Sequence, residues 1–247
     1  MPPDHSNLKA ESFDISERQK YVAELFDTLA PKYDRFNRWV SLFRDAKWRQ
    51  ETVRQLQERA TGVVLDLAAG TGDLAQAALL AGAQQVHVFD IAFEMLSFAK
   101  RKIDQPLRPN QQVTFELGSA NQLPFQSESI DGIVSGFAIR NIYHFLDEVL
   151  SEIYRVLKRG GRLAVLELSQ PGNPFIRLGF RLHMKTVMPL IGRIIAGNSE
   201  PFQYLYQTTM TFLKAKEFAH KLTEAGFHDV QFQKYLFGGI AIHSGCK

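Results

Sequence analysis

The stretch that decides the fold is Val64-Leu65-Asp66-Leu67-Ala68-Ala69-Gly70-Thr71-Gly72-Asp73-Leu74. It predicts a short buried strand, a tight glycine turn, and a helix whose first N–H groups are free to bind a ligand. Asp90 ends the next predicted strand, where a carboxylate can accept hydrogen bonds from a ribose diol. The stretch therefore predicts a nucleotide-binding α/β fold, against the alternative of a plain strand–turn–helix with a surface Asp.

The pattern around this stretch predicts a mostly parallel sheet. Further strands are expected at 85–90, 113–117, 130–135 and 162–168, and helices at 73–82, 92–103 and 143–157. Strands that alternate with helices imply right-handed crossovers, with helices on both faces of the sheet. After a helix at 214–225, strands at 230–235 and 239–243 are close enough in sequence to pair antiparallel.

The rest of the chain is expected to be helical or frayed. Residues 1–14 are polar and predicted to be disordered. Ser16 to Gln19 reads as a capping box for an N-terminal helix, which Pro31 should end or kink. We expect an N-terminal helical lid at 15–60 and one domain at 61–247, with a helical substrate lid at about 172–212.

Composition limits the function classes. The chain has 247 residues, 45% apolar and 22% charged, which fits a globular protein and excludes a disordered chain, a fibre or a disulfide scaffold. Cys246 is the only cysteine, so we expect no internal disulfide or thiolate metal cluster, and a cytoplasmic location. A net charge of +3 is too small for a nucleic-acid binder. No apolar run long enough to span a bilayer and no signal peptide are recognised.

Asp66 helps to decide which nucleotide binds. Gly70-x-Gly72-x-x-Ala75 also fits a dinucleotide fingerprint. However, a buried carboxylate needs a cationic or donor partner and repels a nearby pyrophosphate. S-adenosylmethionine (SAM) carries a ribose, an ammonium group and no phosphate. The arrangement of the acid and the glycines resembles the first motif of class I SAM-dependent methyltransferases.

Two later stretches also resemble that superfamily. Residues 118–125 look like its G-x-A-x-x-L-P-F segment, with Ser119 where Asp or Asn is usual, and residues 152–163 look like its corner ending in P-G-G, with Arg159 for the Pro. The resemblance implies a Rossmann-like, mostly parallel seven-stranded sheet with an antiparallel last strand, plus N-terminal helices and an inserted helical lid. The cofactor-binding residues that it implies are Asp66, Ala68, Gly70, Thr71, Gly72, Asp90, Ser119, Ala120 and Gly136.

Four stretches resemble a narrower family, the quinone C-methyltransferases of menaquinone and ubiquinone biosynthesis. Residues 25–37 resemble its F-D-x-x-A-x-x-Y-D-x-x-N opening, 137–142 its F-G-L-R-N-V, 166–171 its L-E-F-S-x-P, and 237–247 its closing segment. The resemblance implies SAM-dependent C-methylation of a demethylated prenyl quinol, with no metal. It leaves open whether the acceptor is a naphthoquinol or a benzoquinol.

Some positions depart from the family pattern. Phe43 and Asp45 replace the Gly and His of S-x-G-x-H-x-x-W, and Asn198, Pro201 and Phe202 stand for Asp, Ser and Tyr. These changes leave three other hypotheses open: a methyltransferase acting on another aromatic or lipid acceptor, a non-catalytic SAM-binding module, and, as the weakest, a nicotinamide-binding oxidoreductase.

Arg140, Asn141 and Tyr33 are the catalytic candidates. Arg140 and Asn141 follow the fourth strand at its carboxyl end, where α/β sheets bind ligands. Arg140 can stabilise a phenolate or orient a water that takes the proton; the alternative is a structural Arg paired with Asp34 or Asp27. Tyr33 is expected to contact SAM or substrate, or only to pack. His243 is expected to be structural.

Residues 155–193 hold eight Arg or Lys and one acid, Glu167. Arg177, Arg181 and Lys185 recur every four residues among apolar side chains, so a helix would align them. Such a helix suits peripheral association with an anionic membrane on its inner face. The alternative is a core lid helix with a solvated charged stripe. Whether the chain is a homodimer is left open.

Overall fold

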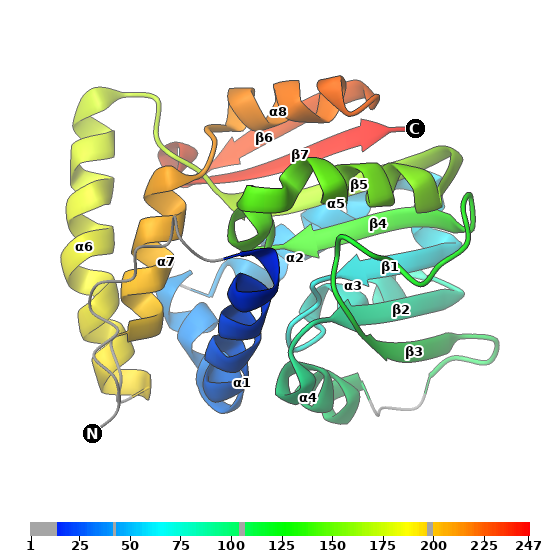
Figure 1. Ribbon diagram of the computed structural model, residues 1–247, viewed down its shortest axis with the longest axis horizontal. Helices are drawn as coiled ribbons and strands as arrows, with labels where there is room; N and C mark the ends of the chain where they lie inside the picture. Colours follow the sequence, from blue (N-terminus) through cyan, green and yellow to red (C-terminus); the bar gives the residue numbers. More distant parts are fainter. Residues whose placement is uncertain (1–13, 42, 104–106, 197–199) are drawn as a thin grey trace.

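A computed structural model describes residues 14–41, 43–103, 107–196 and 200–247 of the chain (Figure 1). Within these residues, one seven-stranded sheet forms the centre. Its strands are β1 (Val63–Leu67), β2 (Gln85–Asp90), β3 (Gln112–Leu117), β4 (Ile130–Gly136), β5 (Leu157–Leu168), β6 (His228–Tyr235) and β7 (Ile240–Cys246). The spatial order is β3-β2-β1-β4-β5-β7-β6. Neighbours from β3 to β5 are parallel, and β7 is antiparallel to β5 and β6, which confirms the predicted sheet.

Helices cover both faces of the sheet because consecutive strand residues point to opposite faces. Leu65 and Leu67 lie in a core cluster with α5 (Leu146–Val156) and α8 (Ala215–Glu224). Val64 lies in a second cluster on the other face. The elements of that cluster are α2 (Asp45–Arg54), η1 (Gln57–Thr61), α3 (Asp73–Ala81) and α4 (Phe93–Ile103). Asp66 shares the face of Val64, so a carboxylate is buried where the pattern calls for an apolar side chain.

A third group of helices lies beyond the carboxyl ends of the parallel strands, on the left of Figure 1. It consists of α1 (Ile15–Val40), α6 (Pro174–Ala196) and α7 (Glu200–Thr211). α1 contacts both α4 and α6, and α6 contacts α7. Two short turns of helix at the same end are η2 (Ile139–Phe145), which follows β4, and η3 (Leu236–Gly238), which precedes β7. The carboxyl ends of the parallel strands are therefore covered by helices.

The N-cap of α1 differs from the one predicted. Asp14, not Ser16, caps the helix, and the Asp14 carboxylate accepts from the Glu17 N–H at 2.8 Å. Ser16 donates its hydroxyl to the same carboxylate at 2.8 Å. The predicted cap is wrong because a charged carboxylate is the stronger acceptor at the positive end of a helix.

Pro31 lies inside α1, so of the two outcomes expected for it, an end of the helix is wrong. A proline in a helix removes one backbone hydrogen bond and crowds the preceding turn. Leu25, Ala30 and Phe36 are buried on both sides of it. Packing of these side chains outweighs the local cost of the proline.

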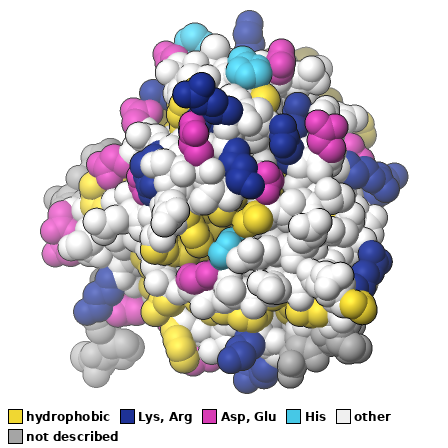
Figure 2. Space-filling view, turned by 90° about the vertical axis from the view of Figure 1, so that its right-hand side faces the viewer, with side chains coloured by type: hydrophobic (Ala, Val, Ile, Leu, Met, Phe, Trp, Pro, Cys, Tyr) yellow, Lys and Arg dark blue, Asp and Glu magenta, His cyan; other side chains and the backbone are white. Residues whose placement is uncertain are grey.

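The side of the molecule away from α6 carries charges of both signs. Figure 2 shows this side, where Lys and Arg side chains are interspersed with Asp and Glu, above a band of hydrophobic side chains. Mixed charge of this kind is typical of an ordinary solvated surface. In the described part of the chain, no helix is long and apolar enough to cross a membrane.

Candidate active site

The turn after β1 curls so that its backbone faces a cavity under α1. Ala68, Gly70 and Gly72 have positive φ angles of 53°, 56° and 79°. Gly72 is required by packing, because a Cβ there would lie 3.0 Å from the Cβ of Ala99 on α4. Gly70 is open on the cavity side, where the nearest atom to an added Cβ is Tyr33 Cε1 at 3.9 Å. The turn thus brings α3 against α4 and leaves its own backbone accessible to a ligand.

Asp90, at the end of β2, holds this turn in place. Its Oδ2 accepts from the Gly70 N–H at 2.7 Å and its Oδ1 from the Ala92 N–H at 2.8 Å. Burial raises the pKa of Asp90, and the two N–H groups oppose that shift. Each oxygen keeps one further acceptor direction, so the carboxylate can position the turn and still bind a ligand hydroxyl.

Asp66 is a buried polar group of the site with only one of its two oxygens hydrogen-bonded. Its Oδ2 accepts from the Ala75 N–H at 2.7 Å, whereas its Oδ1 is buried and accepts no hydrogen bond from any described residue. Burial is the main cause that raises the pKa of Asp66 to about 8; the hydrogen bond from the Ala75 N–H and the charge of Arg49 oppose this shift, and the nearby Asp90 and Asp73 add to it. An unpaired buried carboxylate oxygen is costly unless a ligand donates to it.

The segment after β3 is tied to the start of α1. Gln19 donates its side-chain amide to Ser119 Oγ at 2.8 Å and to Asn121 Oδ1 at 3.2 Å. Ser119 in turn donates to Asn121 at 2.6 Å. The Ser119 hydroxyl is therefore already engaged, and α1 closes over this segment.

These groups surround one space of two halves, here called the turn cavity. The residues that border both halves are Val22, Ala68, Asp90, Ile91, Asn141 and Ile142. One half continues to Asp66, Gly70, Thr71 and Gly136, and the other to Gly118, Ser119 and Ala120. Its shape follows the carboxyl ends of β1, β2 and β4, which is where open α/β sheets bind ligands.

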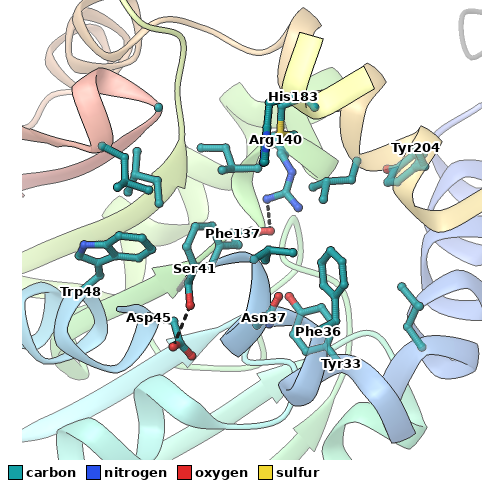
Figure 3. A pocket seen from close by; sticks show the side chains of 18 of the residues that line it. Tyr33, Phe36, Asn37, Ser41, Asp45, Trp48, Phe137, Arg140, His183 and Tyr204 are labelled. Atoms are coloured by element: carbon teal, nitrogen blue, oxygen red, sulfur yellow. Dashed lines mark hydrogen bonds between the residues drawn. The ribbon is translucent and has the colours of Figure 1, made fainter. Parts of the chain in front are cut away.

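A second space, here called the apolar cavity, has a volume of about 210 Å³ (Figure 3). Its walls are mostly apolar and come chiefly from α1, α6, α7, η2 and the start of β7, with Asp45 and Trp48 from α2. The polar side chains in its walls are Lys32, Tyr33, Asn37, Ser41, Asp45, Arg140, His183 and Tyr204. Phe26, Tyr33 and Phe137 border both cavities, so the two spaces meet there.

Arg140 is buried in the wall of the apolar cavity and is held by Glu167 of β5. Its guanidinium donates to Glu167 Oε1 at 2.7 Å, and its backbone N–H donates to Glu167 Oε2 at 3.1 Å. The guanidinium also donates to the carbonyl oxygen of Phe137. The partner is thus Glu167 rather than Asp34 or Asp27, the partners considered from the sequence. Such a pair fixes the orientation of the guanidinium.

Asn141 and Tyr33 are the other two catalytic candidates from the sequence. Asn141 follows Arg140 in η2 but borders the turn cavity, and its Oδ1 is buried and accepts no hydrogen bond from any described residue. Tyr33 of α1 has a raised pKa because of burial, although Arg140 and a hydrogen bond with Asn37 lower it. η2 therefore presents adjacent residues to two different cavities.

Charged side chains that the sequence analysis did not single out link the helices around the turn cavity. Arg49 of α2 pairs with Asp45 at 2.5 Å and with Asp73 at 3.0 Å, and it borders the turn cavity. Lys102 of α4 pairs with Asp73 at 2.7 Å and with Asp34 of α1 at 2.5 Å. The only sequence signal for Arg49 is its i, i+4 spacing from Asp45.

The structure brings most of the predicted residues together. Asp66, Ala68, Gly70, Thr71, Asp90, Ser119, Ala120 and Gly136 border the turn cavity, and Tyr33 and Arg140 border the apolar one. Gly72 borders neither and serves helix packing. The Thr71 hydroxyl donates to Asp34 at 2.5 Å, so its side chain is engaged with α1. Among the described residues, no group of three or more His, Cys, Asp or Glu is arranged to hold a metal ion.

Of the positions that depart from the family pattern before the first strand, Asp45 borders the apolar cavity and Phe43 does not. Asp45 accepts from Ser41 Oγ at 3.0 Å (Figure 3). Phe43 has a φ of 60°, a conformation that favours glycine, and its ring lies against Trp39. Asn198 lies outside the described residues, as do the side chains of 200–203.

His243, in β7, borders neither of the two cavities. It is buried, and its Nε2 bonds the Ala215 carbonyl oxygen at 2.9 Å. Burial lowers its pKa to about 4. It fits the structural role expected from the sequence.

Comparison with known sequences places this arrangement among methyltransferases. A family model described as the ubiE/COQ5 methyltransferase family matches residues 14–247. A "Demethylmenaquinone methyltransferase" of Lactiplantibacillus plantarum is 39% identical, over 92% of this chain and 95% of the relative. A "Ubiquinone/menaquinone biosynthesis C-methyltransferase UbiE" of Rhizobium rhizogenes is 37% identical, over 94% of this chain and 90% of the relative.

Solved structures agree on the fold. A phosphoethanolamine N-methyltransferase of Haemonchus contortus, in complex with S-adenosylhomocysteine, has a TM-score of 0.60 at 17% identity and covers 81% of this chain and 52% of that chain. An S-adenosylmethionine-dependent methyltransferase of Mesorhizobium loti has a TM-score of 0.55 at 14% identity and covers 82% and 98%. Similarity at this level shows the class I SAM-dependent methyltransferase fold alone.

Proposed function

The chain belongs to the ubiE/COQ5 methyltransferase family, and on that premise we propose that it methylates a ring carbon of a demethylated prenyl quinol, with SAM as the methyl donor. The observation that carries the proposal is the meeting of two unlike cavities at Tyr33 and Phe137. One contains a buried acid with an unpaired oxygen, and the other is apolar with a buried Arg. A small cationic cosubstrate suits the first, and an aromatic ring with a prenyl chain suits the second.

The residues of the turn cavity fit SAM. The unpaired Oδ1 of Asp66 suits the ammonium group, the Arg49 guanidinium suits the carboxylate, and the remaining acceptor directions of Asp90 suit the ribose diol. Bound SAM supplies a methyl group on a sulfonium, which is electrophilic without a metal. The further contacts that we propose are Ala68, Gly70, Thr71, Ser119, Ala120, Gly136 and Asn141.

The residues of the apolar cavity fit the acceptor. A quinol carbon becomes nucleophilic when the neighbouring hydroxyl loses its proton, so the site must stabilise the phenolate. Arg140 is oriented by Glu167 and borders the cavity, so it can stabilise that phenolate or orient a water that takes the proton. Tyr33, where the cavities meet, would align the ring with the methyl donor.

α1 would act as the lid of both cavities. Its residues Gln19 and Asp34 hydrogen-bond to Ser119 and Thr71, on opposite sides of the turn cavity. A closed lid excludes water from the methyl donor and holds the reacting atoms in line. We propose this lid role for α1 and not for the whole of 15–60, because α2 packs in the core cluster on the sheet.

The purified protein, SAM and chemically reduced demethylated prenyl quinols would test the function. We expect one methyl group to be added to the ring of a naphthoquinol, a benzoquinol or both, as read by mass spectrometry. A strain that lacks the protein should accumulate the demethylated quinone, and Arg140→Gln should not restore the product. If neither quinol is methylated and the demethylated quinone does not accumulate in the strain, the quinol acceptor is rejected. Another aromatic or lipid acceptor is then favoured.

A further inference from the structure

The face of α6 that looks away from the protein is apolar. Phe175, Leu178, Leu182 and Leu190 expose 85%, 68%, 62% and 58% of their surface. Their spacing places them on one side of the helix, opposite the buried Met184. Single exposed leucines are normal, but a row of large apolar side chains along one helix usually marks an interaction surface.

Basic side chains border this face, and the sequence of α6 itself contains no Asp or Glu. Arg181 and Lys185 are exposed, and neither forms an ion pair with another residue that the structure describes. The sequence from 168 to 199 contains four Lys or Arg and no Asp or Glu. The opposite side of the molecule mixes both signs of charge (Figure 2). The charge therefore matches an anionic partner.

The same face lies beside exposed residues of the apolar cavity wall. A Cβ on Gly239, just after η3, would lie 3.0 Å from Phe180 Cε2, so η3 lies against α6. Phe237 of η3 is 83% exposed. Leu236 and His183 border the cavity and are also exposed to solvent. The wall of the apolar cavity therefore reaches the molecular surface at His183 of α6 and Leu236 of η3, next to the apolar face.

We propose that this docking face, defined as Phe175, Leu178, Leu182, Leu190 and Phe237 with Arg181 and Lys185 at its rim, lies on the surface of an anionic lipid bilayer. A helix that lies in a bilayer interface presents such an apolar side with Lys and Arg and without acids. The inference rests on the proposed function: a prenyl quinol dissolved in lipid would enter the cavity between α6 and η3 without crossing water. The alternative of a lid helix with a solvated charged stripe leaves the apolar row facing water.

Vesicle flotation of the full chain tests the docking face. Wild type should bind vesicles of equal parts phosphatidylglycerol and phosphatidylcholine, and bind pure phosphatidylcholine vesicles weakly. Leu182→Glu should weaken binding by about tenfold, because a charge replaces an apolar side chain that would be buried in the bilayer when the protein is docked. Arg181→Glu with Lys185→Glu should weaken it at least as much, and only on the anionic vesicles.

Leu80→Glu is the matched control, because Leu80 is 66% exposed on α3, away from both cavities. It should bind vesicles as wild type does. With a short-chain, water-soluble quinol, Leu182→Glu should turn over as fast as wild type. With a long-chain quinol embedded in anionic vesicles, it should turn over about tenfold more slowly.

Three results would overturn the docking face. One is equal vesicle binding by wild type and Leu182→Glu. Another is the absence of binding by wild type to the anionic vesicles. The third is a lipid-free dimer, seen by light scattering, that Leu182→Glu abolishes without changing vesicle binding, since the face would then fit a second copy of this chain. If vesicle binding follows the prediction but no quinol is methylated, the proposed function fails and the docking face stands.

Discussion

Replacing Asp66 with Asn should stabilise the protein in the absence of ligand. Burial raises the pKa of Asp66 from 3.8 to about 8, so the folded protein binds this proton more tightly than the unfolded chain does. Stability therefore falls as the pH rises from about 4 to 8. pH 7 lies roughly three pH units above the pKa of Asp66 in the unfolded chain. At that pH the free energy of unfolding is therefore lower than at acid pH by up to about 4 kcal/mol. Asn keeps the acceptor for the Ala75 N–H without the charge.

The same substitution should abolish the release of a proton that accompanies SAM binding in the wild type. A carboxyl with a pKa of about 8 carries roughly 0.9 proton at pH 7, and the proton must leave when an ammonium group binds. SAM affinity should therefore rise about tenfold from pH 6 to pH 7 and peak near pH 8, above which an α-amino group loses its own proton. In Asp66→Asn, affinity should fall roughly ten- to hundredfold, the size of one lost charge-assisted hydrogen bond.

Urea denaturation and titration calorimetry measure these effects. Unfolding of wild type and Asp66→Asn is compared from pH 5 to pH 8, and the gap in stability should shrink toward the acid end. Calorimetry in buffers of different ionisation enthalpy counts the proton released with SAM. An Asn variant that is less stable at pH 7, still binds SAM like wild type and still releases a proton would refute the reasoning.

Four other substitutions or conditions follow from the contacts. Asp90→Ala should raise the SAM dissociation constant at least tenfold and cost about 1–3 kcal/mol of stability, because two N–H groups lose their acceptor; an unchanged constant in calorimetry would remove Asp90 from the site. Glu167→Gln should lower kcat by about ten- to hundredfold with little change in the KM for SAM, because it loosens Arg140; steady-state kinetics in which only the KM for SAM changes would contradict this. Because burial lowers the pKa of His243 to about 4, its contribution to stability is complete above pH 6.5 and is lost as the pH falls toward 4, by about 3 kcal/mol; a His243→Gln variant with the same acid dependence in urea unfolding would disprove it. Phe43→Gly should raise stability by about 1 kcal/mol by relieving a positive φ, and a lower melting temperature would argue against strain there.

Short-range signals predicted the sheet and the turn cavity well. The strand, turn and helix around Gly70 are encoded by neighbouring residues, and the position of Asp90 follows from the length of one helix and one strand. The order β3-β2-β1-β4-β5-β7-β6 then results from right-handed crossovers and a final hairpin. Asp66 could be recognised because an acid inside an apolar strand breaks the local pattern.

Long-range pairing could not be predicted from the sequence. Glu167 orients Arg140 from a different strand, and Arg49 meets Asp73 from a different helix, and no spacing rule connects such positions. The helix through Pro31 is a similar case, because tertiary packing decided it. The charged and apolar faces of α6 were visible in sequence as periodicity, but only the fold shows which face is left without a partner.

α1 has a kinetic consequence. Val22 borders the turn cavity, Leu25 borders the apolar cavity, and Tyr33 borders both. α1 therefore forms a wall of both cavities, so a movement of α1 away from the sheet opens both of them together. If spent cosubstrate leaves past α1, that step also opens the apolar cavity on the α1 side, in addition to its exposed wall at α6 and η3, and turnover cannot be faster than the release of α1 from Ser119 and Thr71.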